Sequence, residues 1–471
     1  MMEKQSPMDR DFAGEEGSSG CSSFVYPEVK RLYECRMADP AFMELLKADP
    51  EGTLEKIQVR MPASKALSIA EECGRSGWDK NPWLSLYRPR LDLISAEISR
   101  RMDASRYKDP ALYRYAQIVR NRIFLYNRIM QGHQNIRYFP AAIELSSGCS
   151  VQCPFCGLDA RPLAGNAAYG DCGILWKEIL EILKGLIGPV ADTVPCYYAT
   201  EPLDNPDYER FLSDYRKVLG ALPQTTTAIA DRDPARLRSL LSLIGKEELS
   251  HAALRISVRT KRQLYRLMES YTPSELEDVE LILNNKEALH YYSDSGRMRL
   301  HHDSPLGIAK PLRYTIACIA GLIINLCDRT VSFVEPELPS ERFPLGMRIY
   351  ESRSFTDAAS FERAAKELFA LYVRDRIRED DLLCFDEEIR VSREGFQFLF
   401  SGDGKALRMG VNRVAAGCLE SILQKSVTVK ELSREQGLSA FVMDSVKEKL
   451  DILFQKGFLR CVPNAARQTT E

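Results

Sequence analysis

Between residues 141 and 284, short apolar runs alternate with longer segments in which apolar residues recur at helical spacing. The predicted strands are 141–145, 193–199, 224–230, 252–258 and 278–284. The predicted helices between them are 173–188, 206–221, 234–247 and 260–270. Such alternation is typical of parallel strands joined by crossover helices, with functional groups gathered at the carboxyl ends of the strands. The sequence therefore predicts an α/β fold.

The first predicted strand ends at three closely spaced cysteines, Cys149, Cys153 and Cys156. Their spacing, C-x3-C-x2-C, puts three thiolates on one short loop, where they can hold three irons of a four-iron cubane. A [4Fe–4S] cluster normally takes four cysteine ligands. With three ligands nearby, one iron stays open for a small molecule.

A structural zinc site is the alternative interpretation, because C-x2-C is half of a zinc motif. Zinc prefers a closed tetrahedral set of ligands, usually from two paired motifs. The nearest histidines, His133 and His251, lie 16 residues before and 95 residues after the triplet. Cys172 is the one close fourth candidate, and it has no partner in a second motif. The cluster interpretation is favoured.

With the aromatic Phe155 before its third cysteine, this motif resembles the signature of the radical S-adenosylmethionine (radical SAM) enzymes. In that family the open iron chelates the cofactor, and an electron from the cluster cleaves its sulfonium. The resemblance implies a partial (β/α)6 TIM-like barrel, a [4Fe–4S] cluster held by Cys149, Cys153 and Cys156, and S-adenosyl-L-methionine as cofactor. It also implies packing of Phe155 at the adenine, against the alternative of ordinary loop packing.

The same resemblance implies cofactor contacts at two further strand ends. The family carries a Gly-Gly-Glu-Pro turn that grips the methionine amine, and here Glu201 matches while Ala199 and Thr200 replace the glycines. The fourth strand carries Ser257 and Arg259, which share one face and fit ribose and carboxylate contacts. The alternatives are a surface carboxylate for Glu201 and a polar strand end for the other two.

The order of segments resembles the radical SAM peptide epimerases of proteusin-type pathways, which convert L-residues of a ribosomally made precursor peptide to D-residues. In these enzymes a radical removes the Cα hydrogen, and a thiol on the opposite face returns hydrogen. By its position Cys384 resembles the family's donor, with Cys327 and then Cys318 as further candidates. A buried thiol is the alternative for each of them. Cys318 and Cys327 could also be the remnant of an auxiliary-cluster site.

Changes in composition divide the chain into five parts. They are a disordered tail (1–22), a helical N-terminal region (23–137), the barrel (138–320), an α+β region with hairpins (321–405) and a winged-helix-like module (406–471). The module has alternating charge and no basic stripe, which favours contacts with protein or peptide over DNA.

Composition limits the classes of binding partner and the cellular location that we expect. The net charge is −2, with 28% charged residues, so bulk charge supports neither a nucleic acid nor a membrane surface as partner. No apolar run reaches the length of a membrane span, and the N-terminus lacks the apolar core of a secretory signal. Thirteen cysteines without a repeating framework indicate reduced thiols and a cytoplasmic protein.

The resemblance implies two partners: a precursor peptide with a leader, docked on the N-terminal helices or the winged helix, and an electron donor such as flavodoxin or ferredoxin. Two other functions remain open. One is a radical SAM maturase that forms thioether or carbon–carbon crosslinks, although such enzymes usually carry auxiliary clusters. The other is a metal-sensing winged-helix regulator, which would need a more basic recognition helix than 440–455.

Overall fold

The computed structural model describes residues 25–73, 88–126, 137–245, 254–288, 292–301 and 311–464. The predicted tail, 1–22, lies outside these residues. The N-terminal region is helical, as predicted, and its main helices are α1 (Val25–Ala38), α2 (Phe42–Ala48), α3 (Pro50–Lys56), α4 (Ala63–Cys73), α5 (Arg88–Arg101) and α6 (Pro110–Tyr126). Asp49 caps α3 by accepting a hydrogen bond from the Gly52 N–H at 3.0 Å, with Pro50 in the first turn.

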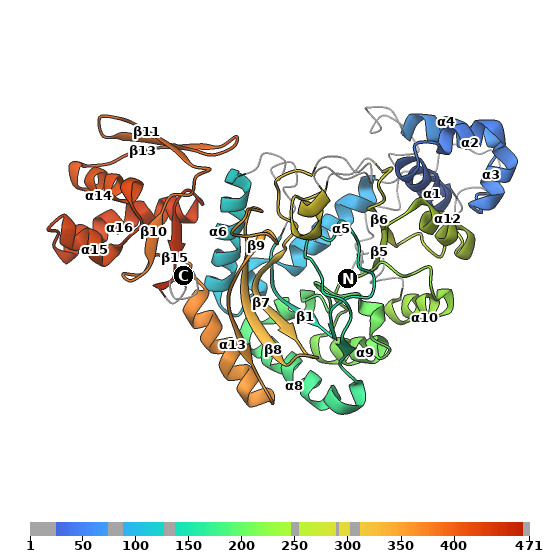
Figure 1. Ribbon diagram of the computed structural model, residues 1–471, viewed down its shortest axis with the longest axis horizontal. Coiled ribbons are helices and arrows are strands. Elements are labelled where there is room, and N and C mark those ends of the chain that lie inside the picture. Colours follow the sequence, from blue (N-terminus) through green and yellow to red (C-terminus); the bar gives the residue numbers. More distant parts are fainter. Residues whose placement is uncertain are drawn as a thin grey trace, which may run out of the picture.

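The central sheet has the strand order β1 (Phe139–Glu144), β7 (Ile319–Asn325), β8 (Thr330–Pro336), β9 (Met347–Ser354). β1 and β7 are parallel, with Glu144 opposite Asn325, so both strands end at the same edge. β7, β8 and β9 form an antiparallel meander, which confirms the hairpin predicted after residue 321. Helices α8 (Tyr169–Ile187) and α13 (Ala358–Tyr372) pack together, and α13 covers β8 and β9 (Figure 1).

A second sheet consists of three parallel strands, β4 (Thr225–Thr227), β5 (Leu254–Val258) and β6 (Glu280–Leu283). The predicted helices around them are present as α9 (Tyr208–Leu219), α10 (Pro234–Ile244) and α12 (Lys261–Ser270). The alternation in the sequence therefore predicted these parallel strands and their crossover helices correctly.

The strand predicted at 193–199 does not form. Gly188, with φ +86°, is followed by the 3-10 helix η5 (Pro189–Thr193), which uses the first residue of the predicted strand. Pro195 has no N–H to donate to a ladder, and its carbonyl accepts one hydrogen bond from the Ile143 N–H of β1 at 2.8 Å. The segment 195–199 therefore lies beside β1 without pairing as a strand. The described part is mixed α/β, as predicted, and none of its sheets closes into a barrel.

The C-terminal part contains two further sheets. β10 (Leu382–Cys384) lies between β14 (Val427–Thr428) and β15 (Arg460–Val462), whereas β11 (Arg390–Glu394), β12 (Gln397–Ser401) and β13 (Ala406–Gly410) form an antiparallel meander. The helices are α14 (Arg413–Gln424), α15 (Val429–Glu435) and α16 (Ala440–Gln455). Figure 1 places this part at the left, beyond α6. No helix of the described residues is long and apolar enough to cross a membrane.

Candidate functional site

The three predicted cluster cysteines lie on a loop at the carboxyl end of β1. A two-residue ladder between β2 (Ser146–Ser147) and β3 (Gly165–Asn166) closes the base of this loop. Within it the Cys149 N–H donates to the Arg161 carbonyl at 2.8 Å, and the Cys156 N–H donates to the Cys153 carbonyl at 3.2 Å. All three cysteines are partly exposed.

The thiols are close enough to affect one another electrostatically. Burial is the main cause of the raised pKa of Cys153, about 11; Arg259 lowers this pKa, and Cys156 and Cys149 raise it. Thiolates are the form that binds metal, and a nearby guanidinium favours them. The structure thus brings Arg259, predicted from a different strand, to the cysteine loop.

Hydrogen bonds from within and from outside the motif fix the backbone of the loop. Gln152 adopts a left-handed conformation, with φ +48°, and its side-chain amide donates to the carbonyls of Cys149 (2.7 Å) and Arg161 (2.9 Å). The Ser150 N–H donates to the Asp204 carboxylate at 2.7 Å. Because Asp204 follows the Glu201 turn by three residues, this bond joins the two predicted motifs.

Arg297 also supports the cysteine loop, although no motif in the sequence indicates it. Its guanidinium donates to the Gln152 side-chain oxygen at 2.8 Å and to the Ala160 carbonyl at 2.9 Å. Its backbone N–H donates to the Cys156 carbonyl at 2.9 Å. The preceding Gly296 has φ +54°, and a Cβ there would collide with the Cys156 carbonyl oxygen. A distant segment, 296–297, therefore packs its backbone directly against the loop.

Glu201 is a buried carboxylate, with 3% of its surface exposed. It accepts hydrogen bonds from the Thr227 hydroxyl at 2.6 Å, the Ala228 N–H at 2.7 Å and the Leu203 N–H at 3.1 Å. Burial raises its pKa to about 7, and its charge contributes to the raised pKa of Cys149, for which burial is the main cause. Among the described residues no cationic side chain forms an ion pair with it, so an added ammonium group would compensate its charge.

Ser257 and Arg259 lie at the carboxyl end of β5, close to Glu201. The Arg259 guanidinium donates to the Ala228 carbonyl at 3.2 Å, and the N–H of Ala228 donates to the Glu201 carboxylate. The Ser257 hydroxyl accepts a hydrogen bond from the Asn284 side chain at 2.8 Å. One residue, Ala228, therefore links the carboxylate and the guanidinium that were predicted to hold opposite ends of an amino acid.

The remaining predicted contacts are Thr200 and Phe155. Thr200 is partly exposed in the turn before Glu201, and the preceding Ala199 N–H donates to Glu144 at 2.8 Å. Phe155 packs its ring against Tyr292, with ring centroids 5.3 Å apart. Both residues lie in the same region as the cysteine loop and the Glu201 turn.

A cavity of about 280 Å³ adjoins the cysteine loop. It is bounded by loop residues 158–161, by Tyr198 and Ala199, and by one face of the central sheet. The side chains on that face are Ile323, Asn325, Thr330, Ser332, Val334, Met347 and Ile349. The other face of β8 is covered by α13, so this face is the one available to a ligand.

Two of the proposed hydrogen donors lie at opposite ends of β7. Cys327 follows the carboxyl end, in the turn to β8, and a Cβ added to Gly165 beside the loop would lie 3.7 Å from its sulfur. Burial raises the pKa of Cys327, which keeps its thiol protonated. Cys318 precedes the amino end, where its carbonyl accepts the Phe139 N–H at 2.8 Å, and burial raises its pKa to about 11.

The structure does not bring Cys384 to the cysteine loop. Cys384 is the last residue of β10, opposite Arg460 of β15, in the C-terminal sheet. In Figure 1 this sheet lies on the far side of α6 from β1, β5 and β6. Its place in the sequence after the predicted barrel did not indicate its place in space. Of the three donor candidates, Cys327 lies nearest to the end of β1 along the sheet.

Whether the implied cluster fits depends on how the metal-binding side chains of the loop are arranged. In the described part of the chain, no three His, Cys, Asp or Glu side chains converge as the ligands of a single metal ion. A four-iron cluster takes one thiolate per iron, so its ligands need not converge on one point. Three partly exposed cysteines on one loop, beside a buried carboxylate that has no cationic partner among the described residues, would suit a cluster together with a zwitterionic cofactor.

Comparisons with known proteins assign no activity. No protein-family model and no solved structure matches this chain. A curated relative, described as the uncharacterized protein y4wI of Sinorhizobium fredii (strain NBRC 101917 / NGR234), is 39% identical over 234 residues. The match covers 48% of this chain and 45% of the relative, so the chain spans less than half of that protein.

Proposed function

We propose that this protein is a radical SAM enzyme that converts L-residues to D-residues in a ribosomally made precursor peptide. The observation that carries the proposal is the link through Ala228 between Glu201 and Arg259, beside the three thiols of one loop. A carboxylate and a guanidinium so placed suit the ammonium and carboxylate of a methionine group. Strands β1, β4, β5 and β6, with the segment 195–199, are proposed as the partial TIM-like barrel.

Each predicted residue then has a role. Cys149, Cys153 and Cys156 would hold the [4Fe–4S] cluster, and Arg297 and Gln152 would position their loop. Glu201 and Arg259 would bind the methionine group, Ser257 the ribose and Phe155 the adenine. The backbone at Thr200, in the turn before Glu201, would also contact the methionine group. When bound, the cluster and S-adenosyl-L-methionine supply a radical that removes the Cα hydrogen of a peptide residue.

The cavity beside the loop is proposed to hold the peptide. Its floor combines hydroxyls (Thr330 and Ser332) with apolar side chains (Val334, Met347 and Ile349), which suits an extended backbone with mixed side chains. Ile349 is 51% exposed and lines this cavity. Peptide contact would cover it.

We assign hydrogen return to Cys327 rather than to Cys384. The Cys327 S–H bond breaks, a new Cα–H bond forms on the opposite face, and a thiyl radical remains on Cys327. One electron and one proton, from a reduced flavodoxin or ferredoxin and from water, restore the thiol. The raised pKa of Cys327 keeps the hydrogen on sulfur at neutral pH. A cytoplasmic location would supply both the reductant and the precursor.

The proposal is tested with anaerobically reconstituted protein, S-adenosyl-L-methionine, reductant and the precursor peptide encoded beside its gene, in D2O. Tandem mass spectrometry should find a gain of one mass unit at each altered Cα. C327A should still form 5′-deoxyadenosine but lose deuterium incorporation, whereas C384A and C318A should retain it.

Other results separate the alternatives. Loss of deuterium incorporation in C384A alone would return the donor role to that residue. A loss of two mass units without deuterium uptake would indicate crosslinking instead of epimerisation. Absence of 5′-deoxyadenosine from protein that carries four irons per chain would overturn the radical mechanism and leave metal sensing as the better explanation.

A further inference from the structure

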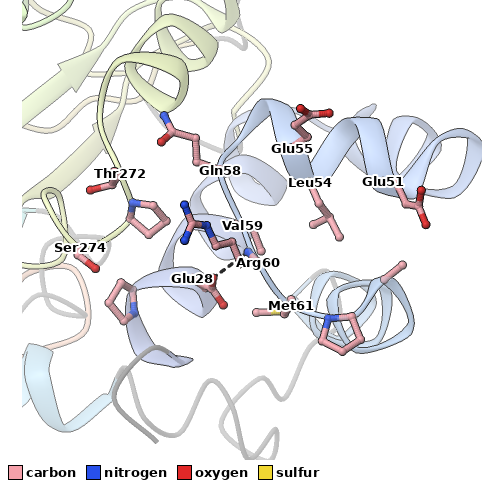
Figure 2. Close-up of a pocket in the computed structure, with 14 residues that line it drawn as sticks. Glu28, Glu51, Leu54, Glu55, Gln58, Val59, Arg60, Met61, Thr272 and Ser274 are labelled. Atoms are coloured by element: carbon pink, nitrogen blue, oxygen red, sulfur yellow. Dashed lines mark hydrogen bonds between the residues drawn. The ribbon is translucent and has the colours of Figure 1, made fainter. Parts of the chain in front are cut away.

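A second and larger cavity lies away from the cysteine loop, between the N-terminal helices and the segment that follows α12 (Figure 2). Its volume is about 720 Å³, within the range of small-molecule and peptide sites. The lining residues come from α1, from α3 and the 57–63 segment, and from 272–274. We call this cavity the N-terminal groove.

The two sides of the groove are fastened to each other. Gln58, with φ +56°, donates from its side chain to the carbonyls of Met268 (2.9 Å) and Glu269 (2.8 Å) at the end of α12. The buried Arg31 donates to the carbonyls of Ile57 (3.0 Å) and Met268 (3.2 Å). Because one pair of side chains holds both walls, the groove is preformed.

The lining combines an apolar floor with excess negative charge. Leu54 and Val59 are buried at its base. The lining carries three glutamates, Glu28, Glu51 and Glu55, and one arginine, Arg60, so its formal charge is −2. Figure 2 shows Glu51 and Leu54 on the same helix, with Glu28 and Arg60 across the groove.

Two of these carboxylates are available to a ligand. Lys56, on the same helix, pairs with Glu269 at 3.9 Å rather than with Glu51 or Glu55. Among the residues with a described structure, neither Glu51 nor Glu55 takes part in an ion pair. Both are exposed, so a cationic side chain entering the groove meets them without breaking an existing contact.

We propose that the N-terminal groove binds a segment of the substrate peptide that carries Lys or Arg beside apolar residues. This inference rests on the proposed function, because it takes the ligand to be the leader of the peptide modified at the cysteine loop. The chain's own residues 1–24 fit poorly, since they carry five acidic and two basic side chains. Charge complementarity therefore favours a separate, basic peptide.

The position of the groove agrees with this role. α12 begins at Lys261, two residues after Arg259, and ends at Ser270, two residues before the groove residue Thr272. Its ten residues span about 15 Å between these two ends, at about 1.5 Å per helical residue. An extended peptide covers that distance with about five residues, so a leader held in the groove leaves a following segment within reach of the cysteine loop.

The test uses a probe of defined chemistry, because the leader is unidentified. A fluorescein-labelled dodecapeptide of alternating leucine and lysine is titrated with the full chain and followed by anisotropy, beside a matched leucine–glutamate peptide. The leucine–lysine peptide should bind more tightly, and added salt should weaken it. The double variant E51Q/E55Q should weaken binding about fivefold, as expected for two exposed charge contacts. S274R, which adds a positive charge at the rim of the groove, should also weaken binding of the leucine–lysine peptide.

The control is E44Q, which removes an exposed carboxylate from α2 outside the groove and should leave binding unchanged. Equal affinity for the two peptides, or equal affinity of E51Q/E55Q and E44Q, would overturn the inference. If E51Q/E55Q instead changes the sedimentation of the protein alone, the groove is a contact between copies and the inference fails. Peptide binding to the groove needs no cofactor. If the peptide binds in a Glu51-dependent way but no 5′-deoxyadenosine forms, the proposed radical chemistry is overturned and the groove inference stands.

Discussion

The Thr227 hydroxyl donates a hydrogen bond to the Glu201 carboxylate across 2.6 Å, in a place where Glu201 is 3% exposed. Two backbone N–H groups, from Ala228 and Leu203, complete the donors around this carboxylate. The three donors hold Glu201 in a fixed orientation, but they do not neutralise its charge. Glu201 is therefore a preorganised acceptor, and its burial has a cost that titration can measure.

We expect Glu201 to reduce the stability of the ligand-free protein as pH rises. Burial raises its pKa from 4.5 to about 7, so above about pH 4.5 the unfolded chain releases this proton before the folded protein does. The free energy of unfolding should fall by about 3 kcal/mol as pH rises from about 4.5 to about 7 and then level off. Urea unfolding at several pH values measures this slope.

The matched variants are E201Q and E44Q. E201Q removes the titrating group, so this part of the pH dependence should disappear. E44Q, on an exposed face of α2, should keep the wild-type slope. The same slope in all three proteins would show that another group is responsible.

Arg297 should affect cluster assembly without a large effect on folding. R297M removes the bonds to Gln152 and Ala160, each contributing about 1 kcal/mol to the position of the cysteine loop. We expect a lower iron content after anaerobic reconstitution, with an unchanged far-ultraviolet circular dichroism spectrum. R161M is the control, because Arg161 is exposed on the same loop. Equal iron content in the two variants would contradict a positioning role for Arg297.

The sequence indicated that Cys153 and Arg259 would lie in one region because both follow strands, β1 and β5, whose carboxyl ends it placed together. Glu201 reaches the same region although the strand predicted before it does not form. The helix at 440–455 was also predicted with its observed ends, because its apolar periodicity is uninterrupted. Local sequence patterns do not predict structure that depends on contacts between distant segments. Pro195 and η5 replace the predicted strand at 193–199, and Arg297 reaches the loop from a segment that carries no recognisable motif.

Arg259 should contribute to cofactor affinity through its charge. A charge-assisted hydrogen bond contributes about 1.5–3 kcal/mol, so R259Q should weaken binding of S-adenosyl-L-methionine to the reconstituted protein by at least about tenfold. Equilibrium dialysis with labelled cofactor measures the change. R232Q is the control. Arg232 is exposed, and its guanidinium donates one long hydrogen bond, of 3.3 Å, to the Ser150 hydroxyl of the cysteine loop. Unchanged affinity in R259Q would remove this residue from the proposed cofactor site.

A buried ion pair joins the C-terminal part to the central sheet. Glu337, which directly follows β8, accepts hydrogen bonds from both terminal nitrogens of Arg460 in β15, one of them at 2.8 Å. Arg348 of β9 contacts the same carboxylate at 3.2 Å. Although burial alone would raise the pKa of Glu337, Arg460, Arg122 and Arg348 lower it to about 2. The contact is therefore between ionised groups.

Removing the charge of Glu337 should loosen the C-terminal part. E337Q removes the carboxylate that Arg460 and Arg348 share and leaves Arg460 paired with Asp386 at 2.8 Å. We expect it to lower the free energy of unfolding by about 3 kcal/mol, the lower end for a broken buried pair. In the wild type, this stabilisation is complete above about pH 4.5 and is lost as pH falls toward about 2. The control is E388Q, which breaks a pair with the half-exposed Arg313 and should cost less than about 1 kcal/mol. If limited proteolysis releases the C-terminal part equally fast from E337Q and E388Q, the buried pair is not what holds it against β8.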